Sequence, residues 1–144
     1  MIGEIATKNG RMDGLIAAAG VQNVTPALDY PPDKITEVGR STIVIRIHCA
    51  NTNLQMMDIN YKGVYLSAVS CARQMIKHGN SGAMLLVGSM SGLNANKGFT
   101  SSVYNSSKAA VIQLGRSLAM EWGKIVDGNP IRVSKLKGIR LTFN

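Results

Sequence analysis

The segment Ser102-Val-Tyr-Asn-Ser-Ser-Lys-Ala-Ala-Val-Ile-Gln-Leu-Gly-Arg-Ser-Leu-Ala-Met120 is the most informative part of this 144-residue sequence, and it contains no proline. In a helix, Tyr104 and Lys108 are four positions apart and therefore lie on the same face, one turn from each other. A cation close to a phenol favours the phenolate, which suits a tyrosine that exchanges protons near neutral pH. Because the same spacing occurs on many solvated helices, the rest of the chain must decide between a catalytic pair and a surface pair.

The segments around this helix alternate between short apolar runs and longer stretches with helical periodicity. The sequence predicts the end of a helix at 4–12, strands at 14–19 and 83–87, a helix at 56–77, the helix that ends near Trp122, and a third strand that begins at Ile131. Such alternation is typical of an α/β fold with a parallel sheet. In these sheets ligands bind beyond the carboxyl ends of the strands, which is where Gly20 and Ser89 fall.

Length and composition indicate one modest domain, with 45% apolar residues to form its core. The two cysteines, Cys49 and Cys71, are in neither a CxxC motif nor a metal-like spacing with histidine, so we expect no metal site and a reducing, cytoplasmic setting. No apolar run approaches the roughly 18 residues of a membrane span. We therefore expect no membrane partner.

The formal net charge of +8 raises the question of nucleic-acid binding. Five of the excess positive charges lie in two acid-free segments, at Arg40, Arg46, Lys135, Lys137 and Arg140. The remainder of the chain is about neutral, has no basic helix face and contains few aromatic residues. We therefore expect no nucleic-acid partner.

Four motifs in a fixed order make the chain from Asp13 to Val133 resemble the classical short-chain dehydrogenase/reductases. They are Leu15-Ile-Ala-Ala-Ala-Gly20 at the family's Asn-Asn-Ala-Gly position, Asp58-Ile-Asn-Tyr-Lys-Gly63, Leu85-Leu-Val-Gly-Ser-Met-Ser-Gly92 and Tyr104-Asn-Ser-Ser-Lys108. The Ser-Met-Ser-Gly stretch and the fifteen-residue step from Ser89 to Tyr104 are most similar to the fungal polyol dehydrogenases and ketose reductases of the mannitol, sorbose or arabinitol type.

The resemblance implies a catalytic set. Tyr104 would exchange a proton with the substrate oxygen, and Lys108 would favour the phenolate and bind the nicotinamide ribose. Ser89 would hydrogen-bond the substrate oxygen as charge develops there, and Asn60 would hold a water that links Lys108 to solvent. The implied catalytic residues are Asn60, Ser89, Tyr104 and Lys108.

Ser89 and Asn60 also have simpler structural interpretations. Ser89 could be a loop serine that caps a turn, and Asn60 a core asparagine bonded to backbone. Ser91 is an alternative for the serine role because it stands thirteen positions before Tyr104, a spacing that other branches of the family use. We prefer Ser89 because it directly follows the apolar strand.

The resemblance implies NAD or NADP as the cofactor, held by Ala18, Ala19 and Gly20 together with Tyr104 and Lys108. The sequence nevertheless lacks the family's glycine-rich turn, Thr-Gly-x-x-x-Gly-x-Gly, whose backbone amides hold the pyrophosphate. The segment that would distinguish NAD from NADP is missing with it. We therefore expect a partial, doubly wound Rossmann-like parallel sheet that lacks its N-terminal strands.

Two segments do not fit this pattern. Residues 39–55 interrupt a predicted helix with a β-branched run, and residues 134–144 replace the family's Asn and Pro-Gly loop. We interpret residues 1–144 as one incomplete Rossmann-like domain with an insertion at 39–55 and an aberrant tail at 134–144. Both segments are consistent with translated intron sequence.

The functional prediction is an oxidoreductase that transfers a hydride between NAD(P)(H) and a small polyol, ketose or similar carbonyl compound. Because the glycine-rich turn is missing, we expect activity to be impaired in this chain. The alternative is an inactive fragment that associates through the helices at 56–77 and 103–122, with itself or with full-length relatives.

Overall fold

The computed structural model describes residues 1–30, 56–123 and 129–136. The helices are α1 (Ile2–Asn9), α2 (Val64–Lys77) and α3 (Ser102–Trp122), the strands are β1 (Gly14–Ala17), β2 (Gly82–Val87) and β3 (Ile131–Leu136), and the short helical turns are η1 (Ala27–Asp29), η3 (Asp58–Gly63) and η4 (Met90–Gly92). The predicted alternation of strands and helices is confirmed.

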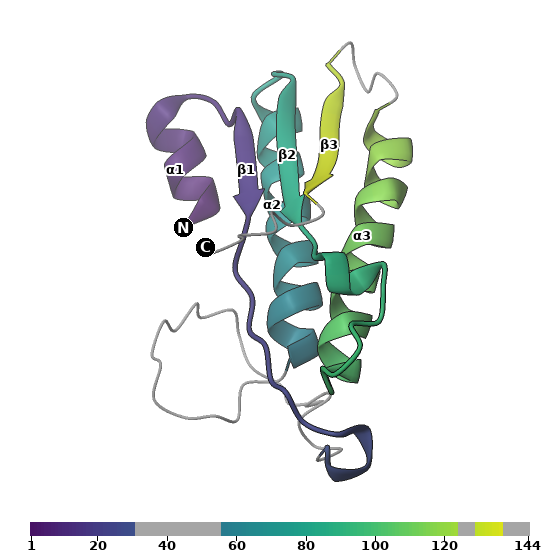
Figure 1. Ribbon diagram of the computed structural model, residues 1–144. Helices are drawn as coiled ribbons and strands as arrows, with labels where there is room; N and C mark the ends of the chain where they lie inside the picture. The colour runs from purple at the N-terminus through teal and green to yellow at the C-terminus, as the bar shows by residue number, and fades with distance from the viewer. Residues whose placement is uncertain (31–55, 124–128, 137–144) are drawn as a thin grey trace, which may run out of the picture.

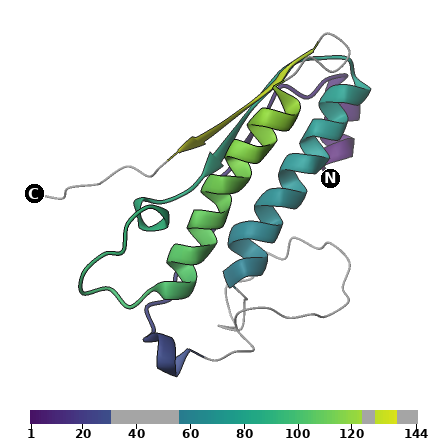
Figure 2. The same cartoon turned by 90° about the vertical axis from the view of Figure 1, so that its right-hand side faces the viewer.

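The three strands form one parallel sheet in the order β1-β2-β3. Gly14 pairs with Ala83 and Gly82 pairs with Ile131, so neighbouring strands start almost level. Parallel neighbours need a crossover, and α2 and α3 supply the crossovers into β2 and β3. Both helices lie on the same side of the sheet, as the two views show (Figures 1 and 2). The predicted α/β fold with a partial Rossmann-like sheet is therefore confirmed.

The core lies between the sheet and these two helices. Met84 and Leu86 of β2 point into it and are buried, and Met75 of α2 and Val111 of α3 close it from the other side. The opposite face of the sheet is different, because Ile16 of β1 is 71% exposed there. In a doubly wound sheet, as the sequence predicts, helices cover both faces. Within the described residues only one face is covered by helices (Figure 2).

The boundaries of two strands differ from those predicted. β1 ends at Ala17 instead of residue 19, and the chain then leaves the sheet. β3 continues through residues 134–136, which pair with residues 85–87 of β2, and Gly88 N donates to Leu136 O at 2.9 Å. The first three residues of the expected tail are thus part of the sheet, because backbone pairing with β2 does not depend on side chains. The proposed insertion at 39–55 lies outside the described residues.

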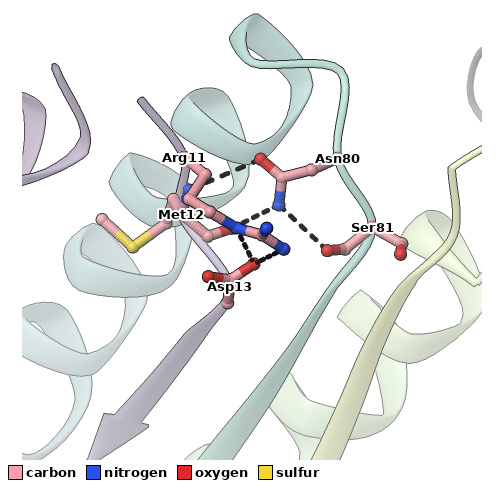
Figure 3. A network of polar contacts seen from close by, with 5 residues as sticks. All are labelled: Arg11, Met12, Asp13, Asn80 and Ser81. Carbon is pink, nitrogen blue, oxygen red and sulfur yellow. Dashed lines mark hydrogen bonds and ion pairs between the residues drawn. The ribbon is translucent and has the colours of Figure 1, made fainter. Parts of the chain in front are cut away.

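A cluster of polar contacts holds the start of β1 against the turn before β2 (Figure 3). Asn80 Nδ2 donates to Met12 O at 2.6 Å and to Ser81 O at 2.9 Å, while Met12 N donates to Asn80 Oδ1 at 3.4 Å. Arg11 and Asp13 form an ion pair beside it, with Nη2 2.7 Å from Oδ1. The Asn80 amide therefore takes the place of a strand neighbour for Met12, just before the sheet begins.

Replacing Asn80 with Ala is expected to lower the free energy of unfolding by about 2 kcal/mol, because Met12 loses two partners at a half-buried site. Urea denaturation measures this change. Asn129→Ala is the matched control, since Asn129 Nδ2 makes one exposed hydrogen bond, to Gly79 O at 3.0 Å. Equal losses in the two variants would contradict a special role for Asn80.

Candidate active site

The chain beyond β1 passes close to Lys108, in the first half of α3. A Cβ atom placed on Gly20 would lie 3.1 Å from Lys108 Nζ and 3.2 Å from Asn60 Oδ1, closer than most side chains approach one another. Glycine is therefore needed here for contact rather than for an unusual backbone angle. Gly20, Asn60 and Lys108 come from three different segments and meet at one point.

Lys108 is buried, with 4% of its surface exposed, and its Nζ donates to Val87 O at 3.0 Å at the carboxyl end of β2. Desolvation by burial lowers the pKa of the Lys108 ammonium below its usual value. The same Nζ lies 5.9 Å from the centre of the Tyr104 ring. Burying an ammonium is costly, so a buried lysine beside a tyrosine indicates a functional site more than a stabilising contact.

Asn60 is fully buried in η3, which is a π-helical turn. Its Oδ1 accepts from Val21 N at 2.8 Å, and its Nδ2 donates to Val21 O and to Ser107 Oγ, both at 2.9 Å. The sequence predicted one regular helix over 56–77, whereas the structure widens its first part into a π turn, a feature that is frequent at functional sites. Both amide hydrogens of Asn60 are used by protein groups, so its side chain has none left to donate to a water.

The two candidate serines lie on the loop after β2. Ser89 caps η4, with its Oγ accepting from Ser91 N at 3.1 Å, and Ser91 Oγ accepts from Asn96 Nδ2 at 2.8 Å. The loop is seated directly on α3, because a Cβ on Gly92 would lie 2.7 Å from Ala109 N. Both hydroxyls therefore accept a hydrogen bond from their own loop.

The structure brings Gly20, Asn60, Tyr104 and Lys108 together. It places Ala18 and Ala19 beyond the end of β1, where both are exposed. Ser89 and Ser91 are anchored through η4 to the same part of α3. Four residues of the sequence-based set thus lie close together, and of the proposed cofactor residues Ala18 and Ala19 are exposed whereas Lys108 is buried.

Ser107 had no predicted role beyond its place in the Tyr104-Asn-Ser-Ser-Lys108 motif. In the structure it is fully buried, and its Oγ donates to Tyr104 O at 2.8 Å while accepting from Asn60 Nδ2. A serine hydroxyl inside a helix often bonds back to the carbonyl three or four residues earlier, so the contact of Ser107 with Tyr104 O was predictable from the sequence. The contact with Asn60 had no local signal, because the two residues are 47 positions apart.

Among the residues that the structure describes, no three His, Cys, Asp or Glu side chains are grouped in a way that could hold a metal ion. Among the described helices, none combines the length and the apolar character required to cross a membrane.

Comparison with known proteins agrees with the geometry. The family model described as short chain dehydrogenase matches residues 1–137. The chain is 44% identical over 112 residues to a D-arabinitol 2-dehydrogenase (ribulose-forming) from Scheffersomyces stipitis, covering 78% of this chain and 34% of that protein. It is 42% identical over 111 residues to an NADH-dependent L-xylulose reductase from Ambrosiozyma monospora, covering 76% of this chain and 34% of that protein.

A solved structure shows the same fold. The chain aligns with a short-chain type dehydrogenase/reductase from Mycobacterium marinum at a TM-score of 0.76 and 28% identity, covering 95% of this chain and 47% of that one. The chain thus spans about a third of the length of its curated relatives and about half of this structure. The similarity to polyol-metabolising members that the motifs predicted is confirmed.

Proposed function

Because the chain belongs to the short-chain dehydrogenase family, we propose that its site transfers a hydride between NAD(P)(H) and a small polyol or ketose. The observation that carries this proposal is the buried Lys108 ammonium, whose Nζ lies 5.9 Å from the centre of the Tyr104 ring and in close approach to Gly20. The names of two relatives, a D-arabinitol dehydrogenase and an L-xylulose reductase, support the substrate class.

In this proposal Tyr104 Oη gives a proton to the substrate oxygen in reduction and takes it back in oxidation. The ammonium of Lys108 places a buried positive charge 5.9 Å from the centre of the Tyr104 ring, and burial strengthens its field there. Ser89 donates its hydroxyl hydrogen to the substrate oxygen, and its place directly after β2 favours it over Ser91. Asn60 fixes the segment after β1 and the first half of α3 through its hydrogen bonds to Val21 and Ser107.

The described residues fit the nicotinamide half of NAD(P). Gly20 puts no side chain between its own backbone and Lys108 Nζ, which a Cβ would approach to 3.1 Å, and its neighbours Ala18 and Ala19 are exposed. Lys108 and Tyr104 would face the nicotinamide ribose there, and a bound nicotinamide would supply or accept the hydride. The glycine-rich pyrophosphate turn is not in this sequence. We therefore expect weak nucleotide binding and slow turnover.

A second candidate is association through the long helices. Four apolar side chains on α2 and α3 are at least 38% exposed: Tyr65, Leu66, Ile76 and Met120. An inactive chain that pairs with itself or with full-length relatives through these helices would cover them. Light scattering over a concentration series separates a monomer from such an assembly.

The proposed activity is tested by titrating the purified chain with NADH and NADPH, followed by the melting temperature and by the fluorescence of bound NADH. Binding to the folded state raises the melting temperature as nucleotide exceeds its Kd. With L-xylulose as substrate, we expect slow NADH oxidation that Tyr104→Phe lowers by about a hundredfold while the thermal shift remains. An absent thermal shift with both nucleotides would contradict the proposal and favour the association model.

A further inference from the structure

Ser107 lies in a continuous line of hydrogen bonds that crosses three segments of the chain. Val21 N donates to Asn60 Oδ1 at 2.8 Å, Asn60 Nδ2 donates to Ser107 Oγ at 2.9 Å, and Ser107 Oγ donates to Tyr104 O at 2.8 Å. Asn60 and Ser107 are both 0% exposed. The line joins the segment after β1, the π turn η3 and the first half of α3.

The chemistry of these groups determines which one donates and which one accepts in each hydrogen bond. Val21 offers a backbone N–H and a backbone carbonyl to Asn60, so only one orientation of the amide satisfies both. That orientation turns an N–H of Asn60 toward Ser107 Oγ, which must then accept. The hydroxyl hydrogen of Ser107 is left for Tyr104 O, where its Oγ is observed. Each group has one role, so removing the Ser107 hydroxyl leaves a buried N–H of the Asn60 amide without an acceptor.

Lys108 is the next residue after Ser107, and it is attached to the opposite side of the site. Its Nζ donates to Val87 O at 3.0 Å, at the end of β2. The turn of α3 from Tyr104 to Lys108 is therefore held twice, toward β1 through Ser107 and toward β2 through Lys108. Losing one attachment would let this turn rotate about the other.

We propose that Ser107 is a positioning residue of the site: its hydroxyl locks the Asn60 amide and thereby sets the place of Tyr104 and Lys108 relative to Gly20. Its effect on catalysis rests on the proposed function, whereas its effect on Asn60 and Lys108 does not. The competing explanation is a buried helix serine that satisfies only its own backbone, which is a common arrangement. That explanation predicts no change at Asn60 or Lys108 when the hydroxyl is removed.

Three variants separate these explanations. Ser107→Ala removes the hydroxyl, Ser107→Thr keeps it, and Ser106→Ala is the matched control because Ser106 is the exposed neighbour. The first readout is the NMR signal of the Asn60 side-chain amide and its rate of hydrogen exchange. The second is the pH titration of the Lys108 side chain, followed by its Cε chemical shift. Where turnover is measurable, kcat and KM are the third.

We expect a slowly exchanging Asn60 amide in the wild type and an exchange rate about tenfold higher in Ser107→Ala, the size expected for one lost buried hydrogen bond. The Lys108 titration should move toward the ordinary lysine value as water reaches the loosened turn. With turnover, kcat should fall about tenfold with a smaller change in KM. Ser107→Thr should restore the wild-type values, and Ser106→Ala should not change them.

The proposal is overturned if the wild-type Asn60 amide exchanges as fast as those of the exposed Asn9 and Asn96, or if Ser107→Ala leaves Asn60 and Lys108 unchanged. If Ser107→Ala does not fold, the wild-type exchange rate and Ser107→Thr still decide the outcome. A chain that shows no nucleotide response contradicts the proposed function. The Asn60 and Lys108 measurements then remain a separate test of Ser107.

Discussion

Replacing Lys108 with Met is expected to lower turnover by about a hundredfold or more while leaving the folded state at least as stable as the wild type. The ammonium is buried, and Nζ has Val87 O as a neutral partner. Methionine fills a similar volume without a charge to desolvate, which offsets the loss of that hydrogen bond. Steady-state rates and urea denaturation measure the two effects.

The stability difference between Lys108→Met and the wild type should depend on pH. Burial lowers the pKa of Lys108 in the folded state below its usual value of 10.5. Between the lowered and the usual value the unfolded chain binds more protons, so wild-type stability rises with pH across that window. The variant lacks this increase, and its advantage should shrink as the pH rises toward the usual value.

Lys97→Met is the control, because Lys97 is exposed. It should leave turnover and stability unchanged. A Lys108→Met protein that is much less stable than the wild type at every pH would mean that Lys108 is a structural residue. The same turnover in Lys108→Met and the wild type would remove Lys108 from the proton-transfer site.

Replacing Gly92 with Ala is expected to destabilise the protein by about 3 kcal/mol and to shift the loop that carries Ser89. The new Cβ would lie 2.7 Å from Ala109 N and 2.7 Å from Lys108 C. These are backbone atoms of α3 and cannot move aside as a flexible side chain could. The turn η4 would have to lift away from α3, which moves Ser89, the residue that caps this turn, relative to α3.

Gly115→Ala is the matched control for this change. Its Cβ would meet Lys135 Cβ at 3.5 Å and Leu86 Cδ1 at 3.7 Å, which are ordinary contacts. In the interior of a helix alanine is favoured over glycine by about 1 kcal/mol, so this variant should be neutral or slightly more stable. Urea denaturation compares the two, and equal effects would contradict the tight seating of η4.

Much of the fold follows from local patterns. The apolar run before Gly88 and the proline-free helix that carries Tyr104 predict their elements because strand and helix periodicity are properties of neighbouring residues. The widened turn at η3 was not predictable in this way. This turn carries Asn60, whose side chain contacts Val21 and Ser107, 39 and 47 positions away in the sequence.

The last strand shows the same limit. Residues 134–136 include a serine and a lysine and have no clear strand pattern, yet they extend β3 to Leu136. Parallel pairing with residues 85–87 supplies backbone partners whatever the side chains are. The composition of these three residues predicted a tail. Backbone hydrogen bonds with β2 instead make them part of the sheet.

The sequence by itself determined that Tyr104 and Lys108 share one helix face, because a helix repeats every 3.6 residues, and its motifs identified the family. Only the tertiary structure decided that Lys108 is buried next to Gly20 and that the Asn60 amide hydrogen-bonds to Val21 and Ser107. It also decided that η4 packs on the backbone of α3. These contacts join residues far apart in the chain, and the packing of helices on the sheet brings them together.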